Sequence, residues 1–319
     1  DGTRFKGNVD ITGLPEPEDM FLYVDVKELI TTKERIESIP LYPFVEETFI
    51  TLPNNFRQLG TIRFKGNFTG FYHDFVTYGN IKTNLGSITT DLSLKLKNGE
   101  PHYKGKIISS RFDLGKFIDI PKDLGEITMN VNIDGKGFSK KEIDASLSGN
   151  INQIVIKGYD YNNVEVKVNF KNQLFNGFLA VKDENISFDF DGNIDFSKKI
   201  PEYHFSSNIE NAKLAKLNLI NSENKLRTRF STQLKVNFIG NSSENIVGDL
   251  KLLNSRYVDD LDSIFIEETK ITSELKDRYR NITILSSILD ANIAGEFNFN
   301  ELTEFINNFF VRYIPSQID

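Results

Sequence analysis

Apolar and polar residues alternate over many short segments of this sequence. In one segment Ile127, Met129, Val131 and Ile133 are separated by single polar residues. Successive side chains of a β-strand point to opposite faces, so each such segment has one apolar face and one polar face. Strands of a helix-covered parallel sheet would instead be apolar throughout. The pattern therefore predicts a mainly β fold built on a long antiparallel sheet.

Turn signals separate these segments, among them Asn98-Gly99 and Asn176-Gly177, and such dipeptides are typical of tight hairpins. A sheet with one apolar face must cover that face. The apolar residues with the clearest alternation are therefore the candidate lining of a shared interior. They are Leu92, Leu94, Leu96, Ile127, Met129, Val131, Ile133, Val164, Val166, Val168, Ile186, Phe188, Phe190, Leu234, Val236 and Phe238.

A short motif, an aromatic residue two positions before a glycine, recurs along the chain. The unit that contains it restarts roughly every 90 to 100 residues, which is the behaviour of a degenerate repeat. Iteration of this kind predicts that residues 1–319 form one elongated repetitive segment, which we expect to belong to a larger protein. The motif stands at Phe5-Lys6-Gly7-Asn8, Phe64-Lys65-Gly66-Asn67, Tyr103-Lys104-Gly105-Lys106 and Phe190-Asp191-Gly192-Asn193.

Two regions depart from the strand pattern. Residues 26–58 are expected to form a helical or irregular insertion, with a helix over 26–38 that Pro40 ends. Residues 301–312 have apolar side chains at helical spacing and predict a C-terminal amphipathic helix. This helix either packs on the sheet edge or serves as a plug or docking surface. Its apolar stripe consists of Leu302, Phe305, Ile306, Phe309 and Phe310.

The composition argues against several classes of function. The chain has 38 Lys and Arg against 45 Asp and Glu, so nucleic-acid binding through phosphates is not expected. It has no cysteine, and its three histidines, His73, His102 and His204, lie far apart in the sequence. Metal or triad chemistry, which needs clusters of such residues, is therefore not expected, and neither is a cofactor.

The apolar face could be covered in different ways. The sheet could fold into a filled sandwich or solenoid, close into a barrel, or curl into an open groove that holds something apolar. An acyl chain of roughly 16 methylenes needs on the order of 13 kcal/mol of shielding in water, at about 0.8 kcal/mol each. Only a continuous apolar lining supplies this, and repeated strands provide one of any length.

The chain resembles the AsmA-like family in the repeated motif, in short apolar helices such as Ala212-Lys213-Leu214-Ala215-Lys216-Leu217, and in strand ends of a Gly-x-Ile-x-Gly style. Within that family the chain is most similar to the TamB branch, in its Bacteroidota form. The resemblance covers most of the chain apart from residues 44–56. It implies a β-taco, a sheet curled into an open groove, with a few short helices and no catalytic residues. Neither the family's N-terminal anchor nor its C-terminal domain is identifiable in the sequence.

The resemblance also implies a setting and partners. Members of the family are anchored in the inner membrane, cross the periplasm, and are implicated in moving phospholipid to the outer membrane. TamB proteins pair with an outer-membrane barrel of the BamA type, here through regions outside this segment. We therefore expect a non-enzymatic periplasmic conduit whose ligands are phospholipid acyl chains. The alternative is a structural or assembly module that binds strands of outer-membrane proteins or the barrel partner. A hydrolase would need convergent acids that the sequence does not display.

Overall fold

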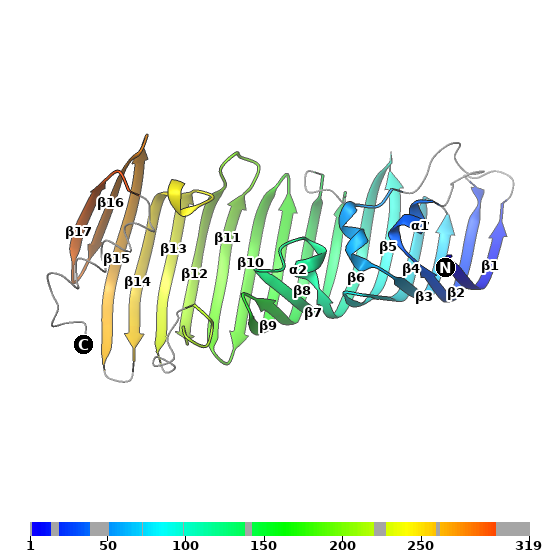
Figure 1. Ribbon diagram of the computed structural model, residues 1–319, viewed down its shortest axis with the longest axis horizontal. Coiled ribbons are helices and arrows are strands. Elements are labelled where there is room, and N and C mark those ends of the chain that lie inside the picture. Colours follow the sequence, from blue (N-terminus) through cyan, green and yellow to red (C-terminus); the bar gives the residue numbers. More distant parts are fainter. Residues whose placement is uncertain are drawn as a thin grey trace. The chain divides into compact units, whose positions relative to one another are not determined.

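A computed structural model of the chain describes residues 2–13, 19–38, 51–71, 73–97, 99–137, 142–219, 228–259 and 262–297. The expectation of a mainly β fold is confirmed. The described residues contain 17 strands in one antiparallel sheet that is not closed into a barrel (Figure 1). The predicted C-terminal helix at 301–312, with its stripe from Leu302 to Phe310, lies outside the described residues.

The strands follow one another with few interruptions. The helical elements of the described residues are short: α1 (Lys33–Glu37), α2 (Leu114–Phe117) and the 3₁₀ turns η2 (Asn54–Leu59) and η4 (Ser243–Asn245). The strands are β1 (Arg4–Thr12), β2 (Phe21–Thr31), β3 (Ile62–Phe71), β4 (Asp74–Thr83), β5 (Gly86–Lys97), β6 (Glu100–Asp113), β7 (Leu124–Lys136), β8 (Asp144–Ile156), β9 (Tyr159–Lys171), β10 (Leu174–Asp183), β11 (Ile186–Asp195), β12 (Glu202–Ala212), β13 (Arg229–Ile239), β14 (Val247–Val258), β15 (Ser263–Lys276), β16 (Tyr279–Ser286) and β17 (Asp290–Gly295).

The chain divides into two compact units. Unit 1 comprises residues 1–173, 177–184 and 216–218, and unit 2 comprises residues 174–176, 185–215 and 219–319. In unit 1, β1 to β9 pair in the order of the sequence, each strand antiparallel to the next. In unit 2, β11 to β17 do the same. Both units are therefore meanders, in which strands that follow one another in the sequence are antiparallel neighbours.

The register of unit 1 aligns apolar residues into rows that cross the strands. Residues directly opposite each other in an antiparallel pair point to the same face of the sheet. Leu92 lies opposite Gly105, and that glycine lies opposite Ile133. Ile133 in turn lies opposite Leu147, and Leu147 opposite Val168. The alternation within each strand thus becomes one continuous apolar face across β5 to β9.

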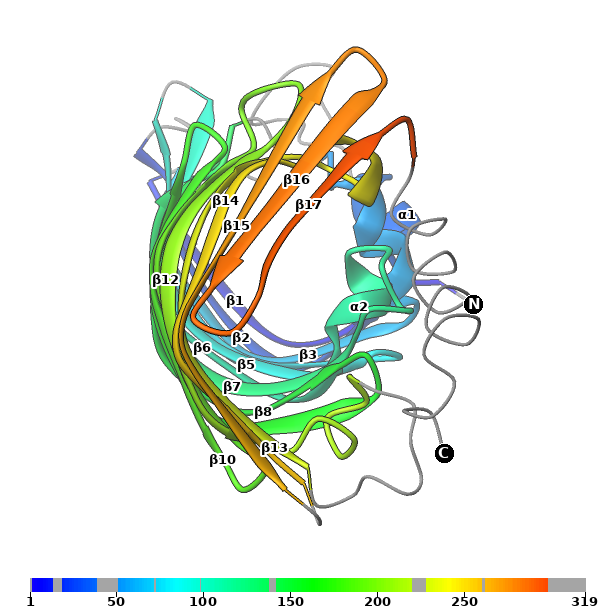
Figure 2. The ribbon, with the colours of Figure 1, turned by 90° about the vertical axis from the view of Figure 1, so that its left-hand side faces the viewer.

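Glycines of the aromatic-glycine motif allow neighbouring strands to approach closely on this face. Gly105 has φ +150°, and a Cβ at this position would lie 2.0 Å from the carbonyl oxygen of Asp91 on β5. A Cβ on Gly79 would lie 2.4 Å from the ring of Phe64, so the aromatic ring occupies the space above a neighbouring glycine. Glycines in strand interiors permit sharp bends. The strands of unit 1 are visibly bent in Figure 2.

The short helices of unit 1 lie on the concave side of its bent strands (Figure 2). The Phe117 ring of α2 lies 5.5 Å from the Phe112 ring, on the strand before it, and 5.7 Å from the Phe56 ring of η2. Phe112 pairs with Ile127, so it belongs to the apolar face. The apolar face of unit 1 is therefore the concave one, and these helices cover one end of it.

The helix expected over 26–38 is wrong in its first half. Residues 26–31 belong to β2, which pairs with β1 on one side and with β3 on the other, and α1 begins only at Lys33. Ladder hydrogen bonds and packing on both sides override a local helical pattern. A register shift beside Val26 explains the misleading spacing, because the bulge places Val26 and Leu29 on the same face.

We predict that Gly105→Ala lowers the free energy of unfolding by about 2–4 kcal/mol, because the new methyl group overlaps the Asp91 carbonyl at an unfavourable φ. Urea denaturation followed by circular dichroism measures this loss. Gly2→Ala is the matched control, since a Cβ there meets no atom within 4 Å. Equal stability of the two variants would contradict the close approach of β5 and β6.

Candidate functional site

The structure brings the predicted lining residues of unit 1 onto one surface, which we call the apolar face of unit 1. All predicted residues of β5, β7 and β9 lie on it, because the register aligns them in common rows. Val131 is fully buried, and Ile127, Val164 and Val166 are nearly so. The exposed fraction of Leu96 is 38 %, so the burial falls off toward the end of β5. The remaining predicted residues on this face, Leu92, Leu94, Met129, Ile133 and Val168, are half-buried.

The predicted lining left out the strands between those that supply it, although the motif at Tyr103-Lys104-Gly105-Lys106 marks one of them. Tyr103 and Ile107 on β6 and Leu147 and Ile151 on β8 belong to the same apolar face. Their alternation is interrupted by glycines and by a serine, Ser109, which weakens the apolar pattern. The aromatic-glycine motif could have added β6 to the predicted lining, because its aromatic residue and its glycine both point to this face.

The apolar face of unit 2 is built in the same way. Phe205 lies opposite Val236, which lies opposite Leu250, and Leu250 lies opposite Ile271. The predicted residues Ile186, Phe188, Phe190, Leu234, Val236 and Phe238 all lie on this face. Ile186 and Val236 are buried, and the other four are half-buried.

Pairs of aromatic rings lie on the apolar face of unit 2. The ring centroids of Phe190 and Phe205 are 4.9 Å apart, and the stacked rings of Tyr203 and Phe238 are 4.5 Å apart. Aromatic pairs at such distances contribute about 0.5–1.5 kcal/mol beyond the area that they bury. Tyr203 and Phe205, like Leu250 and Ile271, were not among the predicted lining residues.

The buried side chains of Arg280, Tyr103 and Ser109 on the apolar faces form hydrogen bonds within the protein. Arg280 has an exposed fraction of 1 %, and its guanidinium donates to the backbone oxygens of Ile246 and Glu244, at 2.9 and 2.6 Å. It also donates to the Ser273 hydroxyl at 2.9 Å. These bonds fasten η4 to β15 and β16, as expected of a buried polar group that stabilises the fold.

Unit 1 shows the same behaviour. The Tyr103 hydroxyl donates to the Gly137 carbonyl at 3.1 Å, and burial raises the pKa of this phenol, with a further contribution from the Asp144 carboxylate. The Ser109 hydroxyl donates to the Ile127 carbonyl at 3.0 Å and accepts from the Met129 amide at 3.2 Å, beside a register shift. Satisfied groups of this kind present little unmet hydrogen-bonding capacity to a ligand.

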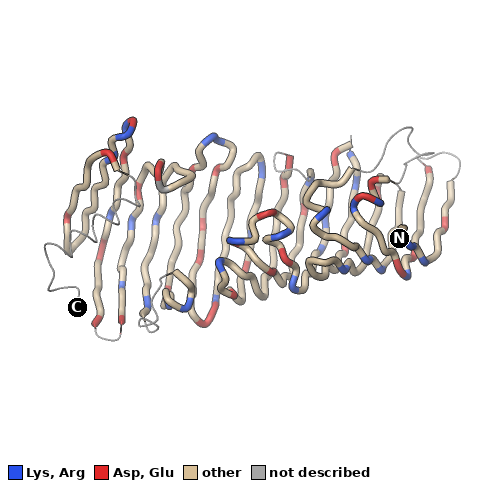
Figure 3. The backbone as a smooth tube through the Cα atoms, in the orientation of Figure 1, with Lys and Arg blue, Asp and Glu red and all other residues tan. Residues whose placement is uncertain are grey.

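The strand residues that alternate with the apolar ones are mostly polar and exposed. Charged residues of both signs are distributed along the strands (Figure 3). Lys104 on β6 pairs with Asp134 on β7 at 2.7 Å, and Arg111 pairs with Glu126 at 2.9 Å. These four side chains are largely exposed, so each pair contributes only about 0–1 kcal/mol. The outer face is thus a solvated surface.

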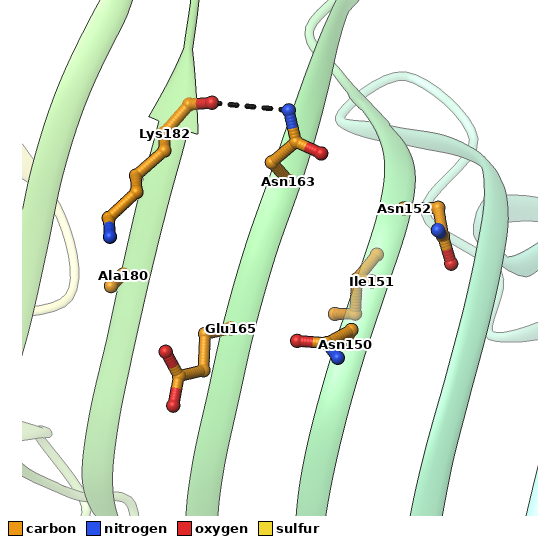
Figure 4. A pocket seen from close by; sticks show the side chains of 7 residues that line it. All are labelled: Asn150, Ile151, Asn152, Asn163, Glu165, Ala180 and Lys182. Carbon is orange, nitrogen blue, oxygen red and sulfur yellow. Dashed lines mark hydrogen bonds between the residues drawn. The ribbon is translucent and has the colours of Figure 1, made fainter.

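One pocket of unit 1, of about 330 Å³, opens on this polar side (Figure 4). Its lining is mainly amide and charged side chains, and the Asn163 side-chain amide donates to the Lys182 carbonyl at 3.3 Å. No residue of the pocket was predicted as a site residue. It is lined by Asn150, Ile151, Asn152, Asn163, Glu165, Ala180 and Lys182.

Within the described ranges, no group of three or more His, Asp or Glu side chains is placed to hold a metal ion. No described helix is long and apolar enough to cross a membrane. Comparison with protein-family models, with curated proteins and with solved structures finds no match for this chain. The two apolar faces are therefore the candidate functional site, on the strength of their own geometry.

We predict that Val131→Asp lowers the free energy of unfolding by about 3–5 kcal/mol, because it places an unpaired carboxylate at a fully buried position. Asn132→Asp, which changes the next and outward-facing residue, should cost no more than about 0.5 kcal/mol. Chemical denaturation of both variants provides the test. Similar losses at the two positions would show that the apolar and polar faces are assigned wrongly.

Proposed function

We propose that this chain is a non-enzymatic segment of a conduit that shields phospholipid acyl chains between the inner and outer membranes. In this proposal the concave apolar face of unit 1 forms a stretch of open groove, a β-taco, and the apolar face of unit 2 forms another. The observation that carries the proposal is that each face runs across successive strands while many of its residues stay only half-buried. A filled core would bury them throughout.

The pattern of exposure supports an accessible interior. In unit 1 the row from Leu92 to Val168 is half-buried, whereas the row that contains Val131 and Val166 is more deeply buried. The helix α2 packs against Phe112 at one end of the face, and η2 packs against α2. Rows away from that end would then offer the surface that an acyl chain contacts. Each methylene removed from water there contributes about 0.8 kcal/mol.

The chemistry of the faces suits passive movement. Tyr103, Ser109 and Arg280 have hydrogen-bond partners within the protein, so they do not offer strong attachment points to a lipid. A lining of similar aliphatic side chains binds successive methylenes with similar free energies. Acyl chains could then slide along it while their headgroups stay in water at the rim. The periplasmic setting, the inner-membrane anchor of a parent protein and a BamA-type partner remain part of the proposal, from the family resemblance.

The alternative, an assembly module that binds strands of outer-membrane proteins, has one observation in its favour. Among the described residues, β1 of unit 1 pairs with β2 on one side and β17 of unit 2 pairs with β16 on one side, which leaves the other side of each strand as an edge within that part of the chain. An edge strand offers backbone donors and acceptors to which an extended segment of another protein can add.

We predict that a photoreactive amino acid at Leu94 or Leu234 cross-links to phospholipid when the chain is made in the periplasm of a Gram-negative host. Both side chains are half-buried on an apolar face. The matched controls are Ser93 and Lys235, which are exposed on the polar face of the same strands and should give at least about tenfold less lipid adduct. Mass spectrometry of the adducts is the measurement.

Equal adducts at inward and outward positions would argue against a lipid-binding face. A photoreactive residue placed instead on β1 or β17 that forms adducts with outer-membrane protein segments would favour the assembly module. Absence of lipid adducts at Leu94 and Leu234, in a chain with native circular dichroism, would overturn the conduit.

A further inference from the structure

A row of charged side chains crosses unit 1 at the ends of its strands, on the side of the sheet opposite to the apolar face. Residues directly opposite each other in antiparallel strands point to the same face. The first five members of the row are each opposite the next, and the last is ion-paired with the fifth. The row, which we call the charged row, consists of Asp74, Lys95, His102, Lys136, Asp144 and Lys171.

The charged row follows a rim of the sheet. The strand β7 ends at Lys136, β8 begins at Asp144, and β9 ends at Lys171. The helix α2 lies at the other end of these strands, because it directly follows the last residue of β6. The strands β4 to β8 are paired on both sides, so most of the row lies in the interior of the sheet and not at its edge.

Each lysine of the charged row has a carboxylate partner, so positive and negative charges are balanced along it. All of these side chains are partly or largely exposed, and exposed ion pairs contribute little to stability. An ionic ligand can therefore exchange partners with them at small cost. The pairs are Lys95 with Asp74, Lys136 with Glu100 at 3.1 Å, and Lys171 with Asp144 at 3.3 Å.

A pocket of about 320 Å³ lies on the charged row. Three members of the row, His102, Lys136 and Asp144, line it together with Ser146 and Asn169. Lysine and N–H donors bind the oxygens of a phosphate ester, and a carboxylate binds a primary ammonium. The pocket thus holds partners for both ends of a small zwitterion.

The charged row adjoins the accessible end of the apolar face. Leu94 precedes Lys95 and Phe170 precedes Lys171, so charged and inward side chains are carried by adjacent residues at the rim. The inward residue Leu96, at this end of β5, has an exposed fraction of 38 %, whereas Phe112, beside α2, has 5 %. A ligand with an ionic head and an apolar chain can therefore contact both faces at this rim.

We propose that the charged row binds the headgroup of a zwitterionic phospholipid, one with a phosphate and a primary ammonium, whose acyl chains lie on the apolar face of unit 1. The phosphate contacts Lys136 and His102, and the ammonium contacts Asp144. An anionic headgroup suits the row less well, because it brings a phosphate to the carboxylates with no ammonium to offset the repulsion. This inference rests on the proposed function and names the class of lipid.

Among the described residues of unit 2, the corresponding strand ends do not carry alternating charges. Two acids, Asp195 and Glu202, lie opposite each other where β11 ends and β12 begins. Glu202 is then opposite Ile239, and Ile239 is opposite Val247. The balanced row is therefore a property of unit 1.

Lipid uptake from mixed vesicles tests the proposal. The purified chain is incubated with vesicles of equimolar phosphatidylethanolamine and phosphatidylglycerol with identical acyl chains, and mass spectrometry of the reisolated protein counts both lipids. The natural chain should take up about threefold or more phosphatidylethanolamine over phosphatidylglycerol, through the balanced charges of the row. Asp144→Lys makes the row positive and should abolish or reverse this ratio. The double variant D144K/K171D restores the balance and should recover the natural ratio to within about twofold.

Glu165→Lys is the matched control. It makes the same change in net charge on the same face, at an exposed position of β9 six residues before Lys171. Six strand residues span about 20 Å, and in about 0.1 M salt charges more than about 10 Å apart are largely screened. The lipid ratio should therefore stay as in the natural chain. Circular dichroism and thermal unfolding verify that each variant is folded.

The outcomes separate this inference from the proposed function. A folded natural chain that takes up neither lipid overturns the conduit, and this inference with it. Equal uptake of the two lipids by the natural chain, or a ratio that Asp144→Lys leaves unchanged, leaves the conduit standing and overturns the role of the charged row. The same holds if Glu165→Lys shifts the ratio as strongly as Asp144→Lys does.

A soluble ligand with the same headgroup chemistry is tested separately. Isothermal titration with O-phosphoethanolamine, which has no acyl chains, should show binding at least about tenfold weaker than that of short-chain phosphatidylethanolamine, because only the lipid also contacts the apolar face. Equal affinities would assign the charged row to a soluble phosphate ester and overturn its assignment to a lipid.

Discussion

Antiparallel pairing between strands adjacent in sequence is the interaction on which everything else in this structure depends. Facing residues in such a ladder point to the same side of the sheet. The apolar side of one strand is therefore continuous with the apolar side of the next. The register that aligns Leu92, Ile133 and Val168 needs no long-range connection to hold it in place. A continuous apolar surface is then a consequence of hairpins alone.

The glycines make that surface concave in unit 1. At Gly105 the backbone of the neighbouring strand lies where a side chain would be, and the same is true at Gly66, where a Cβ would lie 2.1 Å from the Tyr78 carbonyl. These residues interrupt the apolar pattern, yet they allow neighbouring strands to approach closely. Polar residues on the same face, such as Ser109, satisfy the backbone where the register shifts.

These features explain which strands and inward residues could be predicted from the sequence alone. The alternation at 127–133 or 164–168 predicts both the strand and its inward residues, because a period of two has no other structural cause. It could not reveal β6 and β8, whose inward positions include Gly105 and Gly149, since a glycine carries no apolar side chain to count. The helix expected at 26–38 failed because a single extra residue beside Val26 turned a strand pattern into apparent helical spacing. Residues 26–31 form a strand because they pair with β1 and β3, and the sequence alone does not display these partners.

The local character of the pairing has a consequence for how such chains change length. Within each unit a strand exchanges backbone hydrogen bonds with its immediate neighbours, so inserting or deleting one complete hairpin leaves the direction and sidedness of all later strands intact. Loss of a single strand would instead reverse the direction of every strand that follows. Proteins built on this plan should therefore vary by pairs of strands, and their span can be tuned by gene duplication in small increments.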